Sequence, residues 1–308
     1  MHPIAIILPA YNEELTIKDT IEAFYKELPE AHFVVVDNNS SDNTSKIVKE
    51  VFNSLNIKAT LLFEKRQGKG NAIRQAFSKI DAKIYIMSDA DMTYPAYQVH
   101  KLIQKQSDTQ CDMVVGDRLS QGLYKHENKR SFHNFGNSLV KTLINKLFKT
   151  NLDDIMSGYR LFARRFAKNY PILIDGFELE TDMTLHALDK RFHIEEVSIE
   201  YKDRPEGSFS KLSTFSDGAK VLFTIMQIFR YYRPFLFFGT IAILLTFLSL
   251  LSAIPVLNDW FEYKYIYHVP LAILSTGLGI VAVLSFALGL ILDAIAHLHK
   301  MDFENKII

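Results

Sequence analysis

Short apolar runs alternate with amphipathic stretches along residues 4–87. Each run has the length of a strand and ends in a polar or turn-forming cluster. The four runs are residues 4–8, 33–36, 59–63 and 84–87. Between them, apolar residues recur at helical spacing, as at Ile17, Ile21, Phe24 and Leu28. This alternation predicts an α/β fold with a mixed, mostly parallel sheet and helices on both faces.

The pattern continues less regularly as far as residue 201. We expect a strand over 113–115, a helix over 134–148 and a late strand over 195–201. The carboxyl ends of parallel strands meet at one edge of a sheet, and ligands of open α/β sheets bind outside that edge. The polar clusters that follow the strands are therefore expected to form one site.

From residue 212 the pattern becomes helical. One apolar stripe steps by three and four positions and consists of Leu212, Phe215, Ala219, Leu222, Met226 and Phe229. A helix with such a stripe packs on a protein core or lies in a membrane interface. Because a long apolar run follows it, we predict an amphipathic interfacial helix over residues 211–233.

Two long runs carry no charged residue. Residues 235–256 and 269–292 contain no Asp, Glu, Lys or Arg, and the first would span ~33 Å as a helix. A buried core helix is the alternative for each run, but two such runs close together favour membrane spans. We predict a soluble domain over 1–210, transmembrane helices over 234–256 and 268–292 that form a hairpin, and a tail over 293–308.

Charges beside the two spans predict their orientation. Arg230 and Arg233 precede the first span, Lys300 follows the second, and the connecting loop carries few basic residues. The positive-inside rule places both basic flanks in the cytoplasm. We therefore expect a multi-pass protein of the inner (cytoplasmic) membrane, with the soluble domain and the tail on the cytoplasmic side.

Composition adds mainly exclusions. The 35 basic and 35 acidic residues give a formal net charge of zero, so no overall field attracts nucleic acid. Cys111 is the only cysteine, which excludes an intrachain disulfide and a cysteine cluster for zinc. The N-terminus lacks a basic segment followed by a long apolar stretch, so no signal peptide is expected.

Two carboxylates, Asp89 and Asp91, stand one residue apart just after the run 84–87. Like charges this close repel each other, and a cation or hydrogen-bond donors must offset that cost. A hard divalent ion held by one or two carboxylates and by substrate phosphates does so, which predicts Mg²⁺ or Mn²⁺ at Asp89 and Asp91. A solvated Asp-x-Asp loop is the alternative.

Other strand-end clusters weigh against that alternative. They are Pro9-Ala10-Tyr11-Asn12-Glu13, Asp37-Asn38-Asn39-Ser40-Ser41-Asp42-Asn43-Thr44 and Gly68-Lys69-Gly70. With Asp89-Ala90-Asp91 they resemble the donor site of family 2 glycosyltransferases of the GT-A fold, which is Rossmann-like. Further stretches resemble the polyprenyl-phosphate branch, which includes dolichol-phosphate mannose synthases and bacterial undecaprenyl-phosphate glucosyltransferases. These stretches are Gly116-Asp117-Arg118, Ser157-Gly158-Tyr159-Arg160, Asp203-Arg204-Pro205-Glu206-Gly207 and Ser210-Lys211-Leu212.

The resemblance covers about residues 4–235, and the two apolar spans match the bacterial members. It implies an inverting, metal-dependent transfer of a sugar from a UDP- or GDP-sugar to a membrane polyprenyl phosphate. The residues that it places at the nucleotide are Pro9, Ala10, Tyr11, Glu13, Asp37, Asn39, Lys69 and Asp89. Acidic acceptors suit base N–H groups and ribose hydroxyls, and a metal at Asp89 and Asp91 would act as a Lewis acid on the leaving diphosphate.

Two of these positions leave alternatives open. Lys69 either adds a positive charge near the diphosphate or is a solvated loop lysine. Asn39 stands where the family usually has glycine, so either the backbone differs or Asn39 uses the tolerance of asparagine for the left-handed conformation. Residues 92–95 lack the Gln or His frequent in mannose synthases, so the resemblance does not name the sugar.

The acceptor decides whether a base is needed. A lipid phosphate is already ionised at neutral pH, so it needs positioning by cations rather than a base. Guanidinium groups match phosphate bidentately. The candidates are Arg118, Arg130 and Arg204, with surface ion pairing as the alternative for each. A hydroxyl acceptor would require a base, and Asp182 or Glu180 is the nearest match to the usual acid position of the family.

Two other functions remain open. One is transfer to a sugar hydroxyl of a glycolipid or cell-surface polysaccharide. The other is a membrane-tethered nucleotide-binding scaffold, which would be expected to lose the metal carboxylates that this chain retains. Small residues of the second span, Gly277, Gly279 and Gly289, offer surfaces for self-association, so a homo-oligomer is left open.

Overall fold

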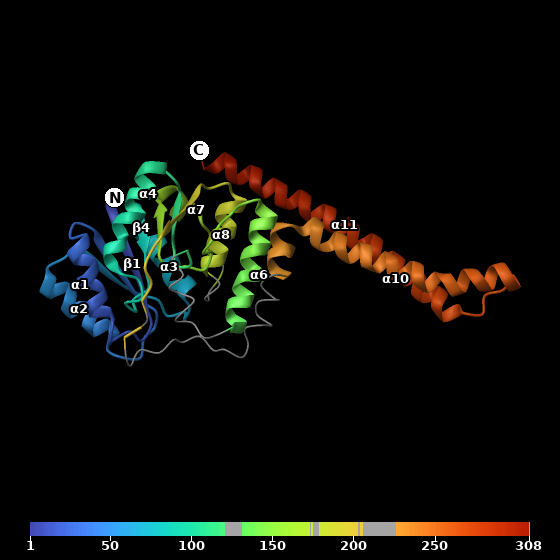
Figure 1. Cartoon of the computed structure of the whole chain (residues 1–308), viewed down its shortest axis with the longest axis horizontal. Coiled ribbons are helices and arrows are strands. Elements are labelled where there is room, and N and C mark those ends of the chain that lie inside the picture. The colour runs from blue at the N-terminus through green and yellow to red at the C-terminus, as the bar shows by residue number, and fades with distance from the viewer. Residues whose placement is uncertain (121–130, 173, 175–178, 203, 206–225, 308) are drawn as a thin grey trace. The chain divides into compact units, whose positions relative to one another are not determined.

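The chain consists of two compact units, Met1–Gly218 and Ala219–Ile308. The structure, a computed structural model, describes residues 1–120, 131–172, 174, 179–202, 204–205 and 226–307. The first unit is an α/β structure around one sheet, and the second is mainly a helical hairpin (Figure 1). Arg130 and most of the predicted interfacial helix over 211–233 lie outside the described residues, whereas residues 226–232 are helical.

A seven-stranded sheet in the order β3-β2-β1-β4-β6-β5-β7 forms the centre of the first unit. The strands are β1 (His2–Ala10), β2 (His32–Asp37), β3 (Ala59–Phe63), β4 (Ala82–Met87), β5 (Met113–Asp117), β6 (Arg160–Ala163) and β7 (Ile194–Ser198). Both pairings of β6 are antiparallel and the other four strand pairings are parallel. The predicted mixed, mostly parallel sheet is therefore confirmed.

The order of the strands creates a switch point between β1 and β4. The chain moves outward from β1 to β2 and β3, and then returns to place β4 on the opposite side of β1. Open α/β sheets bind ligands outside the carboxyl ends of the strands at such a point. Strand β4 ends at Met87, so Asp89 and Asp91 follow it at this position.

Helices cover both faces of the sheet, as predicted. They are α1 (Ile17–Glu27), α2 (Thr44–Leu55), α3 (Lys69–Lys79), α4 (Val99–Thr109) after the 3₁₀ turn η1 (Ala96–Gln98), α6 (Ser131–Phe148), α7 (Arg164–Asn169) and α8 (Leu179–Asp189). Ile6 and Ile86 are register partners on one face and belong to the same core as Phe24 of α1, Val48 of α2 and Leu102 of α4. On that face the apolar stripes of α1, α2 and α4 meet the sheet.

An aromatic cluster fills the other face. Phe77 of α3 packs edge-on against Tyr85 of β4 and Phe162 of β6, with ring centroids 5.4 Å and 5.6 Å apart. Phe162 stacks on Phe166 of α7 at 5.2 Å. These rings bury large apolar areas, and edge-on pairs add to that burial. Helices α3 and α7 are thereby fixed to this face.

The sequence pattern did not reveal α4, β6, α7 or α8. Strand β6 has four residues and begins at the fully buried Arg160, which breaks the apolar pattern. The Arg160 guanidinium donates to the carbonyls of Ser157 (2.8 Å) and Ile155 (2.7 Å) and to Thr184 Oγ1 (2.9 Å). These bonds compensate the burial of its charge, and a charged residue in a short strand has no sequence signature.

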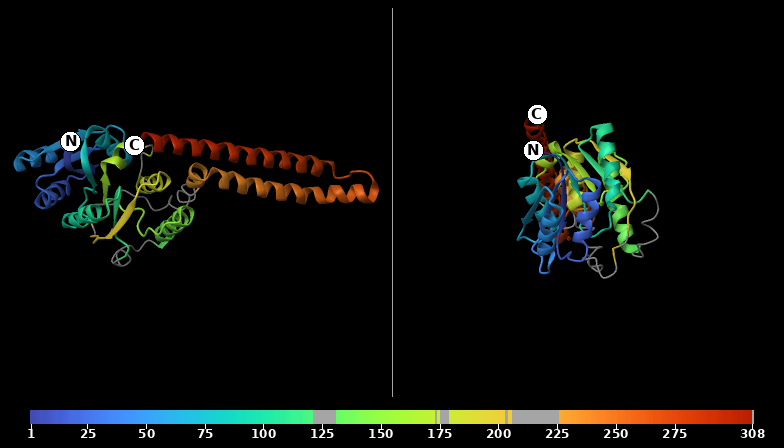
Figure 2. Two further views of the ribbon diagram at one scale, coloured as in Figure 1. Left: turned by 90° about the horizontal axis from the view of Figure 1, so that it is seen from above. Right: turned by 90° about the vertical axis from the view of Figure 1, so that its left-hand side faces the viewer.

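The second unit is dominated by two long helices, α10 (Pro234–Tyr263) and α11 (Val269–Lys306). They run antiparallel and side by side, as both views show (Figures 1 and 2). Their most apolar windows have mean hydropathies of 2.3 and 2.4, yet only 6% and 11% of those windows is buried. Both helices are long and apolar enough to span a membrane, and they extend beyond the predicted ends at residues 256 and 292.

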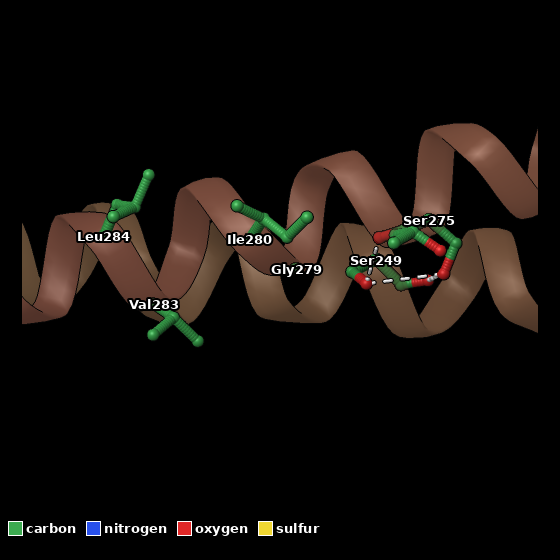
Figure 3. A pocket seen from close by; sticks show the side chains of 7 residues that line it. Ser249, Ser275, Gly279, Ile280, Val283 and Leu284 are labelled. Carbon is green, nitrogen blue, oxygen red and sulfur yellow. Dashed lines mark hydrogen bonds between the residues drawn. The ribbon is translucent and has the colours of Figure 1, made fainter.

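Small polar and small apolar residues hold α10 against α11. Ser249 Oγ donates to the Ser275 carbonyl (2.8 Å), and Ser275 Oγ donates to the Ser249 carbonyl (3.0 Å), as Figure 3 shows. A Cβ on Gly279 would lie 3.4 Å from Ser249 Oγ, and one on Gly289 would lie 3.0 Å from Phe238 Cβ. Close approach at such residues is a usual way for apolar helices to associate.

Candidate active site

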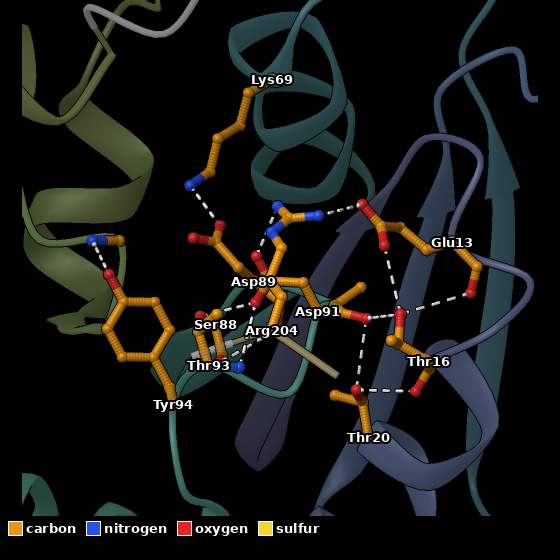
Figure 4. A network of polar contacts seen from close by, with 12 residues as sticks. Glu13, Thr16, Thr20, Lys69, Ser88, Asp89, Asp91, Thr93, Tyr94 and Arg204 are labelled. Carbon is orange, nitrogen blue, oxygen red and sulfur yellow. Dashed lines mark hydrogen bonds and ion pairs between the residues drawn. The ribbon is translucent and has the colours of Figure 1, made fainter. Parts of the chain in front are cut away.

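The Asp89–Asp91 segment is fixed at its backbone by helix α1. Thr16 Oγ1 donates to the Ala90 carbonyl at 2.8 Å, and Thr20 Oγ1 donates to the same oxygen at 3.2 Å. Both threonines are buried. The peptide between the two aspartates is therefore held by Thr16 and Thr20, while the aspartate side chains lie among polar groups of other segments (Figure 4).

Asp91 is buried and is surrounded by donors. Its Oδ1 accepts from the Thr93 amide (3.1 Å) and hydroxyl (2.6 Å), and its Oδ2 lies 2.6 Å from Arg204 Nη2. Arg204 Nη1 lies 3.5 Å from Glu13 Oε1. Burial and the nearby charge of Asp89 raise the pKa of Asp91, against the opposing effects of Arg204 and Thr93. The carboxylate thus lies in a site that favours a cation.

Asp89 pairs with a different cation, Lys69. The Lys69 ammonium contacts Asp89 Oδ1 and lies 2.6 Å from Glu180 Oε1 of α8. Burial alone would lower the pKa of Lys69, but the charges of Asp89 and Glu180 outweigh it and raise that pKa. A Cβ on Gly158 would lie 2.8 Å from Asp89 Oδ2 and 3.0 Å from Lys69 Nζ, so glycine leaves room for this pair.

The ends of β1 and β2 form the neighbouring part of the site. Asp37, at the end of β2, is buried, and it accepts from the Ser40 amide (2.9 Å) and the Ser45 hydroxyl. Asn39 has a φ of 62°, so this asparagine, at a position where the family usually has glycine, adopts the left-handed conformation. The Glu13 amide donates to Thr44 Oγ1 at 2.9 Å, which ties the segment after β1 to the start of α2.

Asn38 ties the loop before α3 to β2. Its Nδ2 donates to the carbonyls of Glu64 (3.3 Å) and Arg66 (2.7 Å), and its Oδ1 accepts from the Gly68 amide at 2.7 Å. Gly68 has φ of 127°, a value that only glycine adopts readily. Lys69 follows directly, so these bonds fix where its side chain begins.

Arg118, at the end of β5, is held by a buried acid. Its Nε and Nη2 donate to Asp154 Oδ2 (2.7 Å) and Oδ1 (3.0 Å), and the guanidinium lies 5.4 Å from the centre of the Tyr201 ring. Burial alone would raise the pKa of Asp154, but the charge and hydrogen bonds of Arg118 hold that pKa below its ordinary value. Glu196 in turn accepts from the Asp154 amide at 2.8 Å.

Tyr94 lies between the Arg118–Asp154 pair and the Lys69–Asp89 pair. Its hydroxyl accepts from the Gly158 amide at 2.9 Å and from Arg118 Nη1 at 3.4 Å. Gly158 in turn packs against Asp89 and Lys69. Tyr94, Thr16 and Thr20 carry no sequence signal of their own, because each lies among ordinary loop and helix residues.

The structure places the other predicted site residues in several separate contacts. Arg204 links Glu13 to Asp91, and Lys69 links Asp89, two residues before Asp91, to Glu180. Arg118 is bound to Asp154, whereas Asp182 accepts from the Tyr170 hydroxyl at 2.6 Å. Pro9 and Ala10 close β1, with Tyr11 directly after them. The roles assigned to these residues stay predictions.

The donor set fits a hard divalent ion that also binds substrate phosphates. Asp89 and Asp91 supply hard oxygen donors at the switch point, and Asp91 already attracts a guanidinium. Among the described residues no group of three or more His, Cys, Asp or Glu side chains could enclose a metal ion alone. Such an ion therefore needs additional ligands, and a diphosphate provides them.

Comparison with known proteins establishes the class. The model of the family "Glycosyl transferase family 2" matches residues 5–170, and the chain belongs to this family. It is a glycosyltransferase of the GT-A fold. It is similar to the glycosyltransferase AglJ of Haloferax volcanii, with 27% identity over 98% of this chain and 96% of that protein.

Two further proteins are similar to this chain. The dolichyl-phosphate beta-glucosyltransferase of Saccharomyces cerevisiae is 29% identical over 71% of each chain. Glucosyl-3-phosphoglycerate synthase of Mycobacterium tuberculosis, solved with Mn²⁺, UDP and glucosyl-3-phosphoglycerate, is similar in structure with a TM-score of 0.56. That comparison has 18% identity and covers 74% of this chain and 79% of that one, so it shows the fold.

Proposed function

We propose that this glycosyltransferase moves a hexose, with inversion, from a UDP- or GDP-sugar to a membrane polyprenyl phosphate. The observation that carries the proposal is the paired-charge cluster at the switch point, where Asp89 and Asp91 each meet a cation. The similarity to a dolichyl-phosphate beta-glucosyltransferase supports the choice of acceptor. The apolar hairpin supports an acceptor that resides in a membrane.

The donor would lie across the ends of β1, β2 and β4. Tyr11, Glu13 and Asp37 are proposed to bind the nucleoside, because carboxylates accept from base N–H groups and ribose hydroxyls. Asp91, assisted by Asp89, would hold Mg²⁺ or Mn²⁺. That ion supplies Lewis-acid stabilisation of the charge on the leaving diphosphate. Arg204, whose pair with Asp91 a metal ion would replace, stays a candidate cation for the acceptor phosphate.

The acceptor phosphate is proposed to bind near Arg118. Its guanidinium is fixed by Asp154 and Tyr201, so it is preorganised rather than mobile. A phosphate monoester is ionised at neutral pH and carries its own nucleophilic oxygen. No protein base is then required, and binding of the phosphate between cations orients that oxygen toward the anomeric carbon. Arg130 is proposed for the same task.

A second acceptor class has one observation in its favour. Glu180 lies within the cluster, bound to Lys69, at a position from which a carboxylate could accept a proton. A sugar hydroxyl on a glycolipid or polysaccharide would need such a base. Asp182, two residues along α8, is the other candidate base, although it is bound to Tyr170.

The hairpin is proposed to anchor the enzyme in the inner (cytoplasmic) membrane with the first unit in the cytoplasm. Arg230 and Arg233 precede α10, and Lys300 lies near the end of α11. Trp260, Tyr263 and exposed neighbouring aromatic residues lie near the turn of the hairpin, where interfacial aromatic belts form. Self-association of this hairpin stays a proposal, with Gly277 as its open small-residue position.

The first test is calorimetric titration of the detergent-solubilised protein with UDP and GDP, with and without Mn²⁺. We expect metal-dependent binding of one nucleotide and its loss in Asp91→Asn. Prenyl phosphate and a panel of nucleotide sugars then test turnover to a lipid-linked product. Nucleotide binding without product on any acceptor would leave a binding scaffold, and product only on a sugar hydroxyl would favour the second acceptor class.

A further inference from the structure

Lys69 joins two acids that come from distant parts of the chain. It is the first residue of α3, and its ammonium lies between Asp89, just after β4, and Glu180, near the start of α8. The side chains of Lys69 and Glu180 are 11% and 8% exposed, whereas that of Asp89 is 30% exposed. Asp89 is therefore the one member of the triad that reaches the surface of the site.

We infer that Glu180 is a positioning residue for the donor site: it holds Lys69 against Asp89 and so fixes the side chain that meets the nucleotide sugar. The inference rests on the proposed function and deepens it. It gives Glu180 a task other than that of a base. It also gives Lys69 a task other than a direct contact with the diphosphate.

The contacts of these side chains support a positioning role for Glu180 and Lys69. The backbone of the Asp89–Asp91 segment is held by Thr16 and Thr20 at the Ala90 carbonyl. That contact leaves the Asp89 side chain free to rotate, and Lys69 is the described cation that restrains it. Lys69 is a flexible side chain whose ammonium would follow either partner. Glu180 binds it from the opposite side and thereby sets its position.

The charges of Lys69, Asp89 and Glu180 also support the inference. One ammonium between two carboxylates leaves the triad with a net charge of −1, and two of its three N–H donors are committed to these oxygens. Hydrogen bonds between charged partners at low exposure are stronger than neutral ones. Gly158 lies directly against Asp89 and Lys69, where a larger residue would displace the pair. The three side chains are thus packed as one unit.

A double-mutant cycle tests the inference with the full-length protein in detergent. UDP or GDP affinity with Mn²⁺ and steady-state kinetics are measured for wild type, Glu180→Gln, Lys69→Gln and the double variant. We expect each single variant to weaken nucleotide affinity about tenfold, and the double variant to be no weaker than Lys69→Gln. Groups that act through one another are non-additive in this way. At saturating donor, kcat should change by less than about threefold.

Other outcomes overturn the inference. Loss of kcat by more than about a hundredfold in Glu180→Gln, with nucleotide affinity unchanged, would make Glu180 a base. Additive losses of affinity would show that Glu180 and Lys69 act independently. Wild-type protein that binds neither nucleotide would overturn the proposed function together with the inference. Wild-type binding that is unchanged in Glu180→Gln would overturn the inference alone.

Two controls separate positioning from general damage. Glu195→Gln removes the acid of another Lys–Glu pair, Lys105–Glu195 (2.9 Å), which lies near the start of β7, at the edge of the sheet away from the site. It should leave nucleotide affinity within about twofold. Glu180→Asp keeps the charge and should retain more affinity than Glu180→Gln. Should Glu180→Gln unfold, Glu180→Asp with Lys69→Gln serves for the same cycle.

Discussion

Each aspartate of the central pair has a cation of its own. Lys69 contacts Asp89, and Arg204 lies 2.6 Å from Asp91. From the sequence, a cation or hydrogen-bond donors were expected to offset the repulsion, with a divalent metal ion as the predicted cation. The structure shows that the protein itself supplies two cations, Lys69 and Arg204. Lys69 is the more firmly held, because it is 11% exposed and lies between two acids, whereas Arg204 is 26% exposed. A metal ion at Asp91 would therefore compete with Arg204 rather than with Lys69.

Replacement of Arg204 should make the nucleotide-free protein bind metal more tightly. Without the guanidinium, Asp91 Oδ2 is left to a metal ion, and an ion pair of this exposure is worth about 1 kcal/mol. We expect Arg204→Gln to bind Mn²⁺ about fivefold more tightly, as measured by electron paramagnetic resonance of free Mn²⁺. Arg164→Gln, which removes the exposed pair with Asp81, is the control. Equal affinity in wild type and Arg204→Gln would contradict the competition.

Asp154 should make stability depend on pH in the acid range. Its pKa is lowered in the folded protein, so its contribution is fully present above the unfolded pKa of about 3.9 and is lost as pH falls through the lower folded value. Removal of one partner of a buried pair costs about 3 kcal/mol. We expect Asp154→Asn to unfold at a lower temperature at pH 7 and to lose less stability than wild type on acidification. Parallel curves for the two proteins would refute this.

The elements that the sequence predicted are those with a clear apolar run or a clear helical period. Strand β3 was predicted with its observed bounds, and β1, β2 and β4 were predicted within a few residues at each end, because strands of a parallel sheet read as short apolar runs. Strand β6 was missed since its buried Arg160 is satisfied by carbonyls from the preceding turn. These hydrogen bonds form only in the folded chain, so the sequence does not indicate that Arg160 can be buried. The strand-end motifs were predicted from the sequence, but the pairing of Lys69 with Glu180 was not.

Helix α11 has two glycines that pack against α10, Gly279 and Gly289, and one that does not, Gly277. A Cβ at Gly289 would lie 3.0 Å from Phe238 Cβ, whereas one at Gly277 would meet nothing within 4 Å. We expect Gly289→Leu to lower the thermal stability of the hairpin by about 1–3 kcal/mol through overpacking. Gly277→Leu should be neutral within about 0.5 kcal/mol. Thermal unfolding in one detergent compares them, and equal effects would mean that the helices do not pack as described.

At the scale of the whole molecule, the apolar hairpin and the α/β unit have separate physical tasks. The first unit buries its core on both faces of the sheet, while the most apolar windows of α10 and α11 are 6% and 11% buried. Exposed apolar surface of this extent requires an apolar partner. The sequence predicted this division from charge-free runs alone, since length and hydropathy suffice for it.

Single-cysteine labelling tests the proposed orientation. Cys111 is the only cysteine of the sequence, so a Cys111→Ala background has no thiol of its own. Glu262→Cys lies at the turn of the hairpin, and Glu304→Cys lies near the end of α11. We expect an impermeant maleimide to label the first in intact cells and the second only in permeabilised cells. Labelling of both from outside would contradict a cytoplasmic tail.

The place of β6 has a consequence for the order in which the chain is made. Strands β1 to β4 form neighbouring parallel pairs from residues 2–87 alone, whereas β5 pairs only with β6 and β7, which come later in the chain. As the polypeptide leaves the ribosome, the half that carries Asp37, Asp89 and Asp91 can assemble first. Strand β5, which precedes Arg118, joins this half of the sheet only after β6 has paired between β4 and β5. Translation thus allows the half that carries Asp37, Asp89 and Asp91 to form before Arg118, Glu180 and Arg204 join it.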